Sequence, residues 1–199
     1  MQDDWKIDNI CRDNYLVGSC NGLVCMFTSD FKLCVLNPCT KELITLENMD
    51  FPVFQKYWML HRIPYLNGFG YDPSSDDYKV LVSQPLRNLI RLYLLSLNSN
   101  VCKVVGDFHI TIAYNSAGIL CNGALYWLMA DQNMNPVQHI LSFHLSKDEF
   151  KEIPIPADHK CKVTDRTRLG IVEECLCIFD ESSCDQPKWA MKNYNDTQS

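Results

Sequence analysis

Short glycine-containing segments recur along this chain at intervals of close to 50 residues. The two clearest are Asn21-Gly22-Leu23-Val24 and Asn122-Gly123-Ala124-Leu125, whose asparagines lie 101 positions apart. Similar glycine-led strands begin near Gly70 and Gly170, so the steps from Gly22 are 48, 53 and 47 residues. A period of this length, with several short strands per repeat, is typical of a kelch-sized β-propeller blade. We therefore expect four all-β units.

Apolar runs separated by turn residues fill the first unit. Residues 23–27, 32–36 and 43–46 are short apolar runs that we predict to be three strands. Between the second and third runs lies Asn37-Pro38-Cys39-Thr40. Proline fixes φ near −65° at the second position of a four-residue turn, and the preceding asparagine accepts backbone hydrogen bonds. The order predicts an antiparallel meander.

The remaining units follow the same order. In the second unit we predict strands at 69–71, 78–82, 91–97 and 101–105, the last two apolar on both faces and therefore buried between neighbouring sheets. The third unit has apolar runs at 124–128, 139–145 and 149–153, and the fourth has them from 169, at 175–179 and at 188–192. The sequence turns polar after Tyr194, so the fourth unit is predicted to be incomplete and the propeller partial.

Composition narrows the classes of partner. The 199 residues are 47% hydrophobic and 21% charged, with a formal net charge of −6, which is a globular composition. Binding to nucleic acid or to an anionic membrane needs clustered Lys and Arg, and the basic residues here are scattered. No stretch approaches the roughly 18 apolar residues of a spanning helix, and the amino terminus does not resemble an export signal. We expect a soluble protein of the cytoplasm or the nucleus.

The eleven cysteines are expected to be reduced, and mostly buried as small apolar side chains. Zinc is the alternative, because Cys20, Cys25, Cys34 and Cys39 lie within 20 residues of one another. Zinc pairs, however, sit in tight turns, whereas Cys20 and Cys25 border a predicted strand. Copper would need a converging set of His and Tyr ligands near the propeller axis, which the sequence neither shows nor excludes. We expect no cofactor.

Two further motifs invite a catalytic or metal-binding interpretation. Gly18-Ser19-Cys20-Asn21-Gly22 has the spacing of a hydrolase elbow with a cysteine nucleophile, but an elbow needs a helix after the nucleophile, and residues 23–27 are a predicted strand. The acidic segment from Asp72 to Asp77 resembles a calcium loop. It lacks the glycine and glutamate that an EF-hand requires at its sixth and twelfth positions. We interpret these aspartates as turn formers.

The longest predicted loop, about residues 48–67, is the best candidate for binding another protein. Aromatic residues and arginine dominate the energetics of protein interfaces, and this loop is rich in both. The alternative is that its rings cover the edge of a neighbouring blade. The candidate partner-binding residues are Phe54, Tyr57, Trp58, His61, Arg62 and Tyr65.

Five segments of the chain are, in order, LVGSCNGLVC (16–25), LNPCTKE (36–42), GFGYDPSSDDYKV (68–80), NGALYW (122–127) and WAMKNY (189–194). In this order they closely resemble the F-box-associated domain of plant F-box proteins. The pollen S-locus F-box proteins look similar too. The resemblance spans about residues 15–194 and implies a kelch-like propeller. In that family an amino-terminal F-box binds the Skp adaptor of a cullin-type (SCF) ubiquitin ligase, and the associated domain captures the protein to be ubiquitinated.

The resemblance suggests a domain division with two departures from the family. We expect a linker remnant at 1–14, the propeller domain at 15–194 and a disordered tail at 195–199. No F-box precedes residue 15, so Skp binding is not expected of this chain, and the family's later strands do not follow Tyr194. The leading hypothesis is a non-enzymatic protein-recognition domain. The alternatives are a metal- or cysteine-dependent propeller enzyme and a non-functional truncated product.

Overall fold

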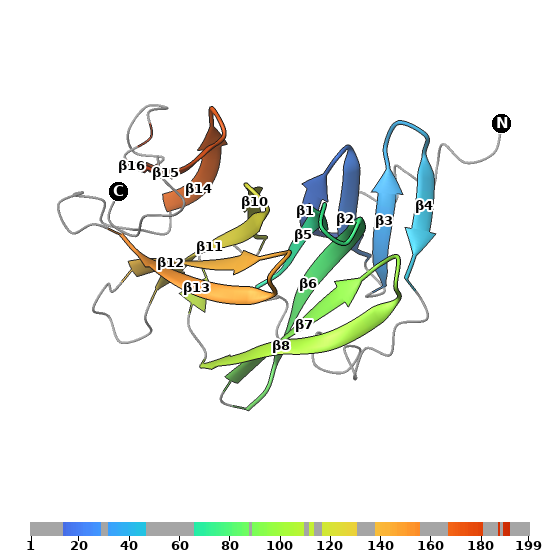
Figure 1. The fold of residues 1–199 in the computed structure, drawn as a ribbon, viewed down its shortest axis with the longest axis horizontal. Helices are drawn as coiled ribbons and strands as arrows, with labels where there is room; N and C mark the ends of the chain where they lie inside the picture. Colours follow the sequence, from blue (N-terminus) through green and yellow to red (C-terminus); the bar gives the residue numbers. More distant parts are fainter. Residues whose placement is uncertain are drawn as a thin grey trace.

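The computed structural model describes residues 14–28, 32–46, 66–87, 89–109, 112–113, 117–130, 138–155, 167–180, 187 and 189–191. Within these ranges all regular structure is β-strand, and no helix is long and apolar enough to cross a membrane. The sixteen described strands form four antiparallel sheets, which follow one another along the chain as the blades of a β-propeller (Figure 1). The predicted all-β propeller is confirmed.

The first two blades each contain four strands in sequence order. Blade 1 consists of β1 (Tyr15–Cys20), β2 (Leu23–Phe27), β3 (Leu33–Asn37) and β4 (Glu42–Thr45). Blade 2 consists of β5 (Gly68–Asp72), β6 (Asp77–Pro85), β7 (Leu89–Ser96) and β8 (Val101–His109). The sequence predicts all of these strands except β1.

Blades 3 and 4 repeat the meander. Blade 3 consists of β10 (Ile119–Cys121), β11 (Ala124–Ala130), β12 (Gln138–His144) and β13 (Glu149–Pro154), with the two-residue strand β9 (Ile112–Ala113) paired to β11. Blade 4 consists of β14 (Thr167–Val172), β15 (Cys175–Asp180) and β16 (Trp189–Ala190). The last blade thus has three described strands, whereas the other blades have a fourth at the perimeter.

Tight turns form one end of every blade. In a meander the turn from the first to the second strand and the turn from the third to the fourth lie at the same end. All ten described residues with positive φ occupy these turns: Asn21, Gly22, Lys41, Asp76, Asn100, Asn122, Gly123, Asp148, Glu173 and Glu174. The connections between blades leave from the opposite end. The propeller therefore has a tight-turn end and a long-loop end.

The glycines that reveal the repeat are of two kinds, which corrects the expectation that each one leads a strand. Gly22 and Gly123 are second residues of two-residue hairpin turns, with φ of 78° and 74°. Gly70 and Gly170 instead lie inside the first strands of their blades, β5 and β14. The period survives this correction because the first strands begin at residues 15, 68, 119 and 167, in steps of 53, 51 and 48.

The hydrophobic core is divided into layers between adjacent blades. One cluster joins blades 1 and 2, and includes Val17, Phe27, Val80 and Leu95. Larger side chains fill the layer between blades 2 and 3: Leu66, Leu81, Ile90, Leu92, Leu94, Leu125, Trp127, Met129, Leu141, Phe143 and Leu145. A third layer joins blades 3 and 4. Each internal sheet is therefore covered on both faces.

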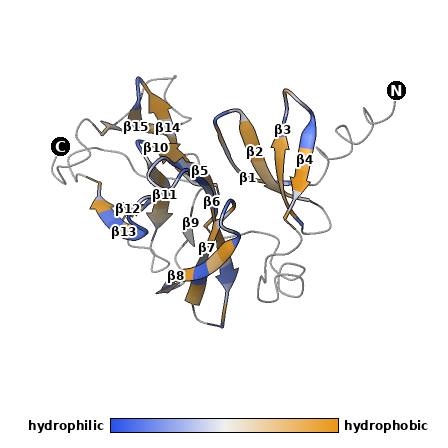
Figure 2. Cartoon of the chain, turned by 45° about the vertical axis from the view of Figure 1, so that its right-hand side comes forward, coloured by the Kyte–Doolittle hydropathy of each residue, from blue (hydrophilic) through white to orange (hydrophobic). Residues whose placement is uncertain are grey.

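The outermost strands are more polar than predicted. Of the strand predicted at 91–97, the part that lies in β7 (91–96) is largely buried, as expected, but in β8 Val101 and Val104 are 51% and 52% exposed. Hydrophilic segments appear on β4, β8 and β13, the perimeter strands of three blades (Figure 2). Blades diverge away from the propeller axis, so the fourth strand loses the cover of its neighbours. An apolar run alone could not reveal this position.

Candidate functional site

The six predicted partner-binding residues, Phe54, Tyr57, Trp58, His61, Arg62 and Tyr65, lie outside the described residues, in the connection from β4 to β5. The structure does describe the two ends of this connection. Leu46 N donates to Leu33 O at 2.9 Å, and Leu66 N donates to Ser83 Oγ at 3.0 Å. Both ends are therefore anchored to the sheets at the long-loop end.

A polar network at the tight-turn end begins with Asp72, the last residue of β5. Its Oδ1 accepts hydrogen bonds from the backbone N of Ser74 at 3.0 Å and from Ser74 Oγ at 2.7 Å. Its Oδ2 accepts one from Ser75 Oγ at 2.7 Å. These bonds close the turn after β5, as the sequence predicts for an aspartate followed by Pro and Ser. Asp72 is nevertheless only 1% exposed.

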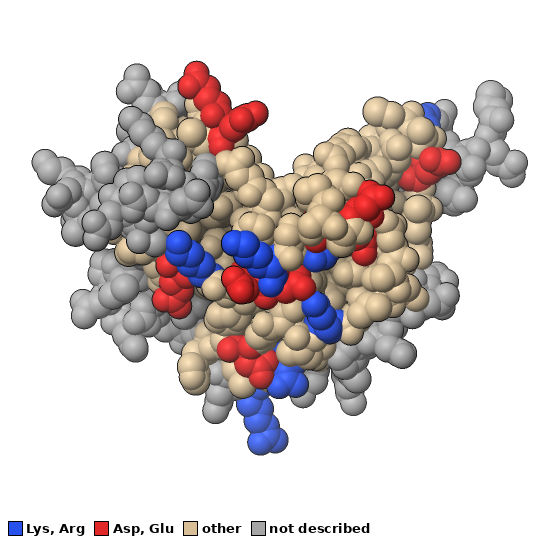
Figure 3. All heavy atoms as spheres, viewed as in Figure 1, with Lys and Arg blue, Asp and Glu red and all other residues tan. Residues whose placement is uncertain are grey.

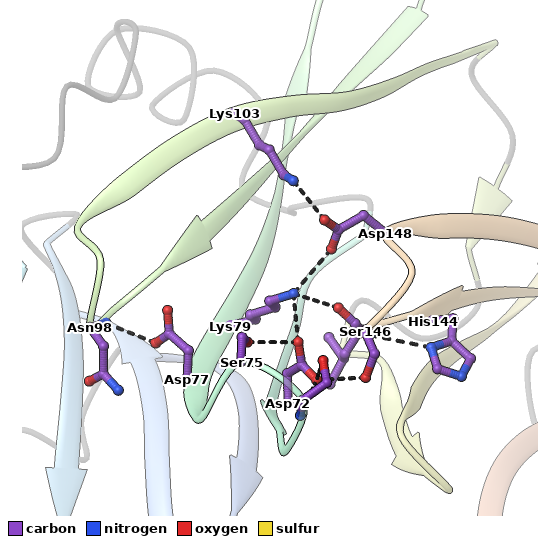
Figure 4. A network of polar contacts seen from close by, with 11 residues as sticks. Asp72, Ser75, Asp77, Lys79, Asn98, Lys103, His144, Ser146 and Asp148 are labelled. Atoms are coloured by element: carbon purple, nitrogen blue, oxygen red, sulfur yellow. Dashed lines mark hydrogen bonds and ion pairs between the residues drawn. The ribbon is translucent and has the colours of Figure 1, made fainter.

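Lys79 on β6 connects this turn to blade 3 (Figure 4). Its Nζ lies 2.9 Å from Asp72 Oδ2 and 3.2 Å from Asp148 Oδ1, and donates to Leu145 O at 2.6 Å. Lys103 on β8 donates to the other oxygen of Asp148 at 2.6 Å, and Ser146 Oγ donates to Asp72 Oδ1 at 2.6 Å. We call Asp72, Lys79, Lys103, Ser146 and Asp148 the inter-blade network.

The inter-blade network keeps both buried charges ionised. Burial alone would raise the pKa of Asp72, but hydrogen bonds from Ser146, Lys79, Ser74 and Ser75 outweigh it and hold the pKa far below its usual range. Burial would likewise lower the pKa of Lys79, and the carboxylates of Asp72 and Asp148 raise it instead. The three protons of the ammonium match three acceptors. This arrangement stabilises the contact between two blades and presents no reactive group.

Lys79 is a residue that sequence reasoning missed. The pattern Tyr78, Val80, Val82 identifies one buried face of β6, and that face does pack against blade 1. The opposite face carries Lys79, and there Leu81 and Ser83 are also buried. In the sequence, the apolar Leu81 is the one residue of this face that indicates that both faces of β6 are covered. A lysine on a covered face needs a carboxylate partner.

A second polar contact between blades 2 and 3 lies at the long-loop end. The carbonyl of Asn67 accepts hydrogen bonds from Gly118 N at 2.6 Å and from Trp127 Nε1 at 3.0 Å. The side-chain Oδ1 of Asn67 accepts one from Ser83 N at 3.3 Å, while its buried Nδ2 has no hydrogen-bond partner among the described residues. The indole of Trp127 is fully buried between the sheets. Blades 2 and 3 are thus joined by polar contacts at both ends.

The asparagines of the two Asn-Gly turns contact the following blade. Asn21 Nδ2 donates to the hydroxyl of Tyr78 at 3.4 Å, which joins blade 1 to blade 2. Asn122 Nδ2 donates to the carbonyl of Glu174 at 3.3 Å, which joins blade 3 to blade 4. Both bonds are exposed and long. Each turn asparagine therefore adopts the backbone conformation that the hairpin requires and also donates a hydrogen bond to the next blade.

The cysteines do not form the elbow that the Gly18–Gly22 spacing suggests. Cys20 ends β1 and is followed by a two-residue turn and β2, which confirms the predicted strand after it. Burial raises the pKa of the Cys20 thiol, and the buried Cys25 thiol is shifted in the same direction. Four of the eight described cysteines are buried: Cys25, Cys34, Cys121 and Cys177. Cys175, expected in the core with Cys177, is only partly buried.

Metal-binding arrangements do not occur within the described residues: no group of three or more His, Cys, Asp or Glu side chains could hold an ion there. His139 and His144, five positions apart on β12, point to opposite faces of the sheet. The oxygens of Asp72, at the start of the acidic segment that resembles a calcium loop, are occupied by serine and lysine donors. The turn-forming role of Asp72 is therefore confirmed.

Charges of both signs are mixed on the face shown in Figure 3, where Lys and Arg lie next to Asp and Glu around the contact of blades 2 and 3. Within blade 2, the exposed pair Arg91 and Asp107 has a nitrogen–oxygen distance of 2.7 Å. A notch in the same view separates blade 4 from blade 1. Mixed charge suits a protein partner better than a nucleic acid.

Comparison with known proteins gives consistent results. The family described as "F-box associated beta propeller domain" matches residues 7–198. The chain is 31% identical over 198 residues to the F-box/kelch-repeat protein At3g23880 of Arabidopsis thaliana, covering 94% of this chain and 52% of that protein. It is 30% identical over 176 residues to the putative F-box protein At3g21120 of the same plant, covering 80% of this chain and 43% of that protein. It is 27% identical over 208 residues to the F-box protein CPR1, also of this plant, covering 89% of this chain and 48% of that protein. The chain spans about half the length of the curated relatives it matches.

Proposed function

This chain belongs to the F-box associated β-propeller domain family, and on that basis we propose that it is a protein-recognition domain that selects proteins for ubiquitination. The relatives are F-box proteins. In such proteins the F-box docks on the Skp adaptor and the associated domain captures the target. We extend the second of these roles to this chain, and assign it no catalytic reaction.

The observation that carries the proposal is the anchored connection between β4 and β5. Its ends are hydrogen-bonded to β3 and β6, and the segment between them supplies the aromatic rings, histidine and arginine at positions 54, 57, 58, 61, 62 and 65. Aromatic rings and arginine dominate the binding energy of protein interfaces. We therefore place the partner-binding site at the long-loop end, on these six residues.

The test is a quantitative capture experiment from plant cell extract with a proteasome inhibitor present. The tagged chain is compared with a variant in which the six residues are alanine. The matched control replaces two exposed residues of the perimeter strand β8, Val101→Ser and Val104→Ser. We expect at least one protein whose recovery falls about tenfold or more with the six-alanine variant and is unchanged with the control. Equal recovery with all three folded proteins would contradict the assignment.

We also propose that the chain acts in the cytoplasm or the nucleus, where ubiquitination of such targets takes place. The reduced state of the eight described cysteines is compatible with either compartment. Imaging of a fluorescent fusion in plant cells would test this, and accumulation in a secretory compartment would contradict it.

A further inference from the structure

Three described strands lie at the perimeter of their blades, namely β4, β8 and β13. A strand edge can pair with another chain, and proteins usually prevent this with charged residues, proline or a bulge. Both β8 and β13 have such features. The register of β8 shifts at Val105, and Lys103 and Asp107 carry charges. The six residues of β13 include three charged ones and end with Pro154.

The edge strand β4 lacks these features. Its one charged residue, Glu42, begins the strand and is followed by Leu43 and Ile44, which are 39% and 62% exposed. Ile44 is the most exposed large hydrophobic side chain in the part of the chain that the structure describes. Figure 2 shows the hydrophobic half of β4, and in Figure 1 the strand lies at the margin of the molecule. This edge can therefore be extended by a further strand.

The backbone groups of β4 that point away from its sheet belong to Leu43 and Thr45. Leu46 N donates to Leu33 O at 2.9 Å, so residue 46 faces β3. In an antiparallel pair, alternate residues exchange hydrogen bonds with the neighbouring strand. Ile44 therefore faces β3 as well, whereas Leu43 and Thr45 direct their N–H and C=O groups outward. Among the described residues these outward groups have no hydrogen-bond partner.

We propose that β4 pairs antiparallel with β4 of a second copy of this chain, about a two-fold axis at Ile44. In such a pair the outward residues of one copy must face those of the other, which requires the axis to pass through a residue. An axis at Leu43 would set Lys41 against Thr45, but Lys41 belongs to the turn and has a φ of 61°. An axis at Ile44 uses only residues 42–46 and sets Leu43 opposite Thr45.

This register extends the core of blade 1 into the second copy. Ile44 pairs with Val35, and Val35 with Cys25, on the face that packs against blade 2. The two copies of Ile44 form a directly opposed pair with Cα atoms about 4.5 Å apart. The two Glu42 residues lie four strand positions, or about 13 Å, from each other. Charges interact over roughly 8 Å at physiological salt, so the pairing buries Ile44 without bringing like charges together.

The size of the contact sets the expected affinity. The pairing involves residues 42–46 of each copy, whereas a stable interface involves roughly 20–30 residues a side. We expect a weak dimer, with a dissociation constant of about 10–100 µM. A second copy suits the edge because two-fold pairing makes one strand complementary to itself, and such dimers are the commonest assemblies.

Sedimentation velocity of the complete chain, in reducing buffer between about 1 and 300 µM, tests the proposal. We expect a monomer at the lowest concentration and mostly a dimer at the highest. A chain that stays monomeric at 300 µM would overturn the proposal, whatever other strand then binds this edge. Growth beyond the dimer would overturn it too, because a two-fold contact closes on itself.

The substitution Ile44→Lys sets two ammonium groups against each other at the axis and should weaken the dimer at least about tenfold. The matched control is Val104→Lys, which adds the same charge at a valine of β8 that is 52% exposed and should leave dimerisation unchanged. If Ile44→Lys does not fold, Ile44→Thr keeps the β-branched shape and should weaken the dimer about threefold. Unchanged dimerisation in a folded Ile44 variant would contradict the proposal.

Amide exchange measured by nuclear magnetic resonance tests the register. The N–H groups of Leu43 and Thr45 should exchange at least about twofold more slowly at 300 µM than at 30 µM, because pairing protects them. The N–H of Ile44 already faces β3, so its exchange should not change with concentration. A dimer that leaves exchange at Leu43 and Thr45 unchanged would have its contact elsewhere, and the proposal would be wrong.

Discussion

Single residues decide the turns at which each blade reverses. Blades 1 and 3 use Asn-Gly, and these residues have φ of 50° and 78° in the first case and 46° and 74° in the second. Blade 4 reaches nearly the same backbone with Glu173 and Glu174, at 48° and 62°. Left-handed backbone is strained for glutamate and nearly free of strain for glycine. Sequence reasoning finds the Asn-Gly turns but has no signal for the turn in blade 4.

Replacing the strained pair should stabilise the protein. The double substitution Glu173→Asn and Glu174→Gly should raise the free energy of unfolding by about 1 kcal/mol, since both new residues favour the observed φ. The carbonyl of residue 174, which accepts bonds from Asn122 and Cys121, belongs to the backbone and is retained. Urea denaturation provides the measurement. A decrease in stability would show that the carboxylates make a contribution larger than the strain.

The reverse change provides the matched control. At Gly123 an added Cβ would meet no atom within 4 Å, so Gly123→Ala introduces backbone strain without a clash. We expect it to lower the free energy of unfolding by about 1 kcal/mol in the same denaturation experiment.

Asp72 should make stability depend on pH in acid. Its pKa is lower in the folded chain than in the unfolded chain, so its contribution is complete above the unfolded pKa of about 3.9 and is lost as the pH falls below that value. Asp72→Asn should lower stability at pH 7 and flatten the fall in stability between about pH 4 and pH 2. The measurement is thermal denaturation across this range, with Asp107→Asn as the exposed control. An unchanged acid slope in Asp72→Asn would contradict the role of the carboxylate.

At the level of elements, the first strands of blades 1 and 2 are shaped by close approach to the next blade. A Cβ at Gly18 would lie 3.1 Å from the backbone nitrogen of Phe69, and one at Gly68 would lie 2.6 Å from the side chain of Leu125 in blade 3. Glycine is required where two sheets converge on the propeller axis. The sequence predicts the longer, apolar strands correctly. It does not predict β1 and β10, because close blade contact rather than side-chain pattern defines them.

Gly118→Ala tests a close contact inside blade 3, where an added Cβ just before β10 would lie 2.7 Å from the Trp127 ring on β11. The ring of Trp127 cannot move away easily because its Nε1 is hydrogen-bonded to the Asn67 carbonyl. We expect a loss of about 1–3 kcal/mol in the free energy of unfolding. In a Trp127→Leu background, where the ring is absent, the same substitution should have a markedly smaller effect. Equal losses in both backgrounds would place the strain elsewhere.

How deeply a perimeter strand is buried depends on its position in the blade and not on its apolar sequence pattern. The apolar pattern of residues 101–105 suggests a strand covered on both faces, but β8 lies where neighbouring blades diverge. Likewise, the charged pair Lys79 and Asp148 is 69 positions apart in the chain, and only the packing of blade 2 on blade 3 brings it together.

At the scale of the whole molecule, the two ends of the propeller have different characters. One end consists of tight turns, two of which are held by the inter-blade network, and the described ends of the connections between blades lie at the other. The family and the propeller could be predicted from the sequence because five motifs and a period of close to 50 residues agree. The placement of the six partner-binding residues stays a prediction.

The most direct test of the proposed recognition role joins the F-box region of a relative, such as the F-box/kelch-repeat protein, to the amino terminus of this chain. The measurement is the half-life, in plant cells, of a protein captured by the chain. We predict a shorter half-life with the fusion, restored by a proteasome inhibitor and by the six-alanine variant. A half-life that is the same with the fusion and with its six-alanine variant would contradict the account.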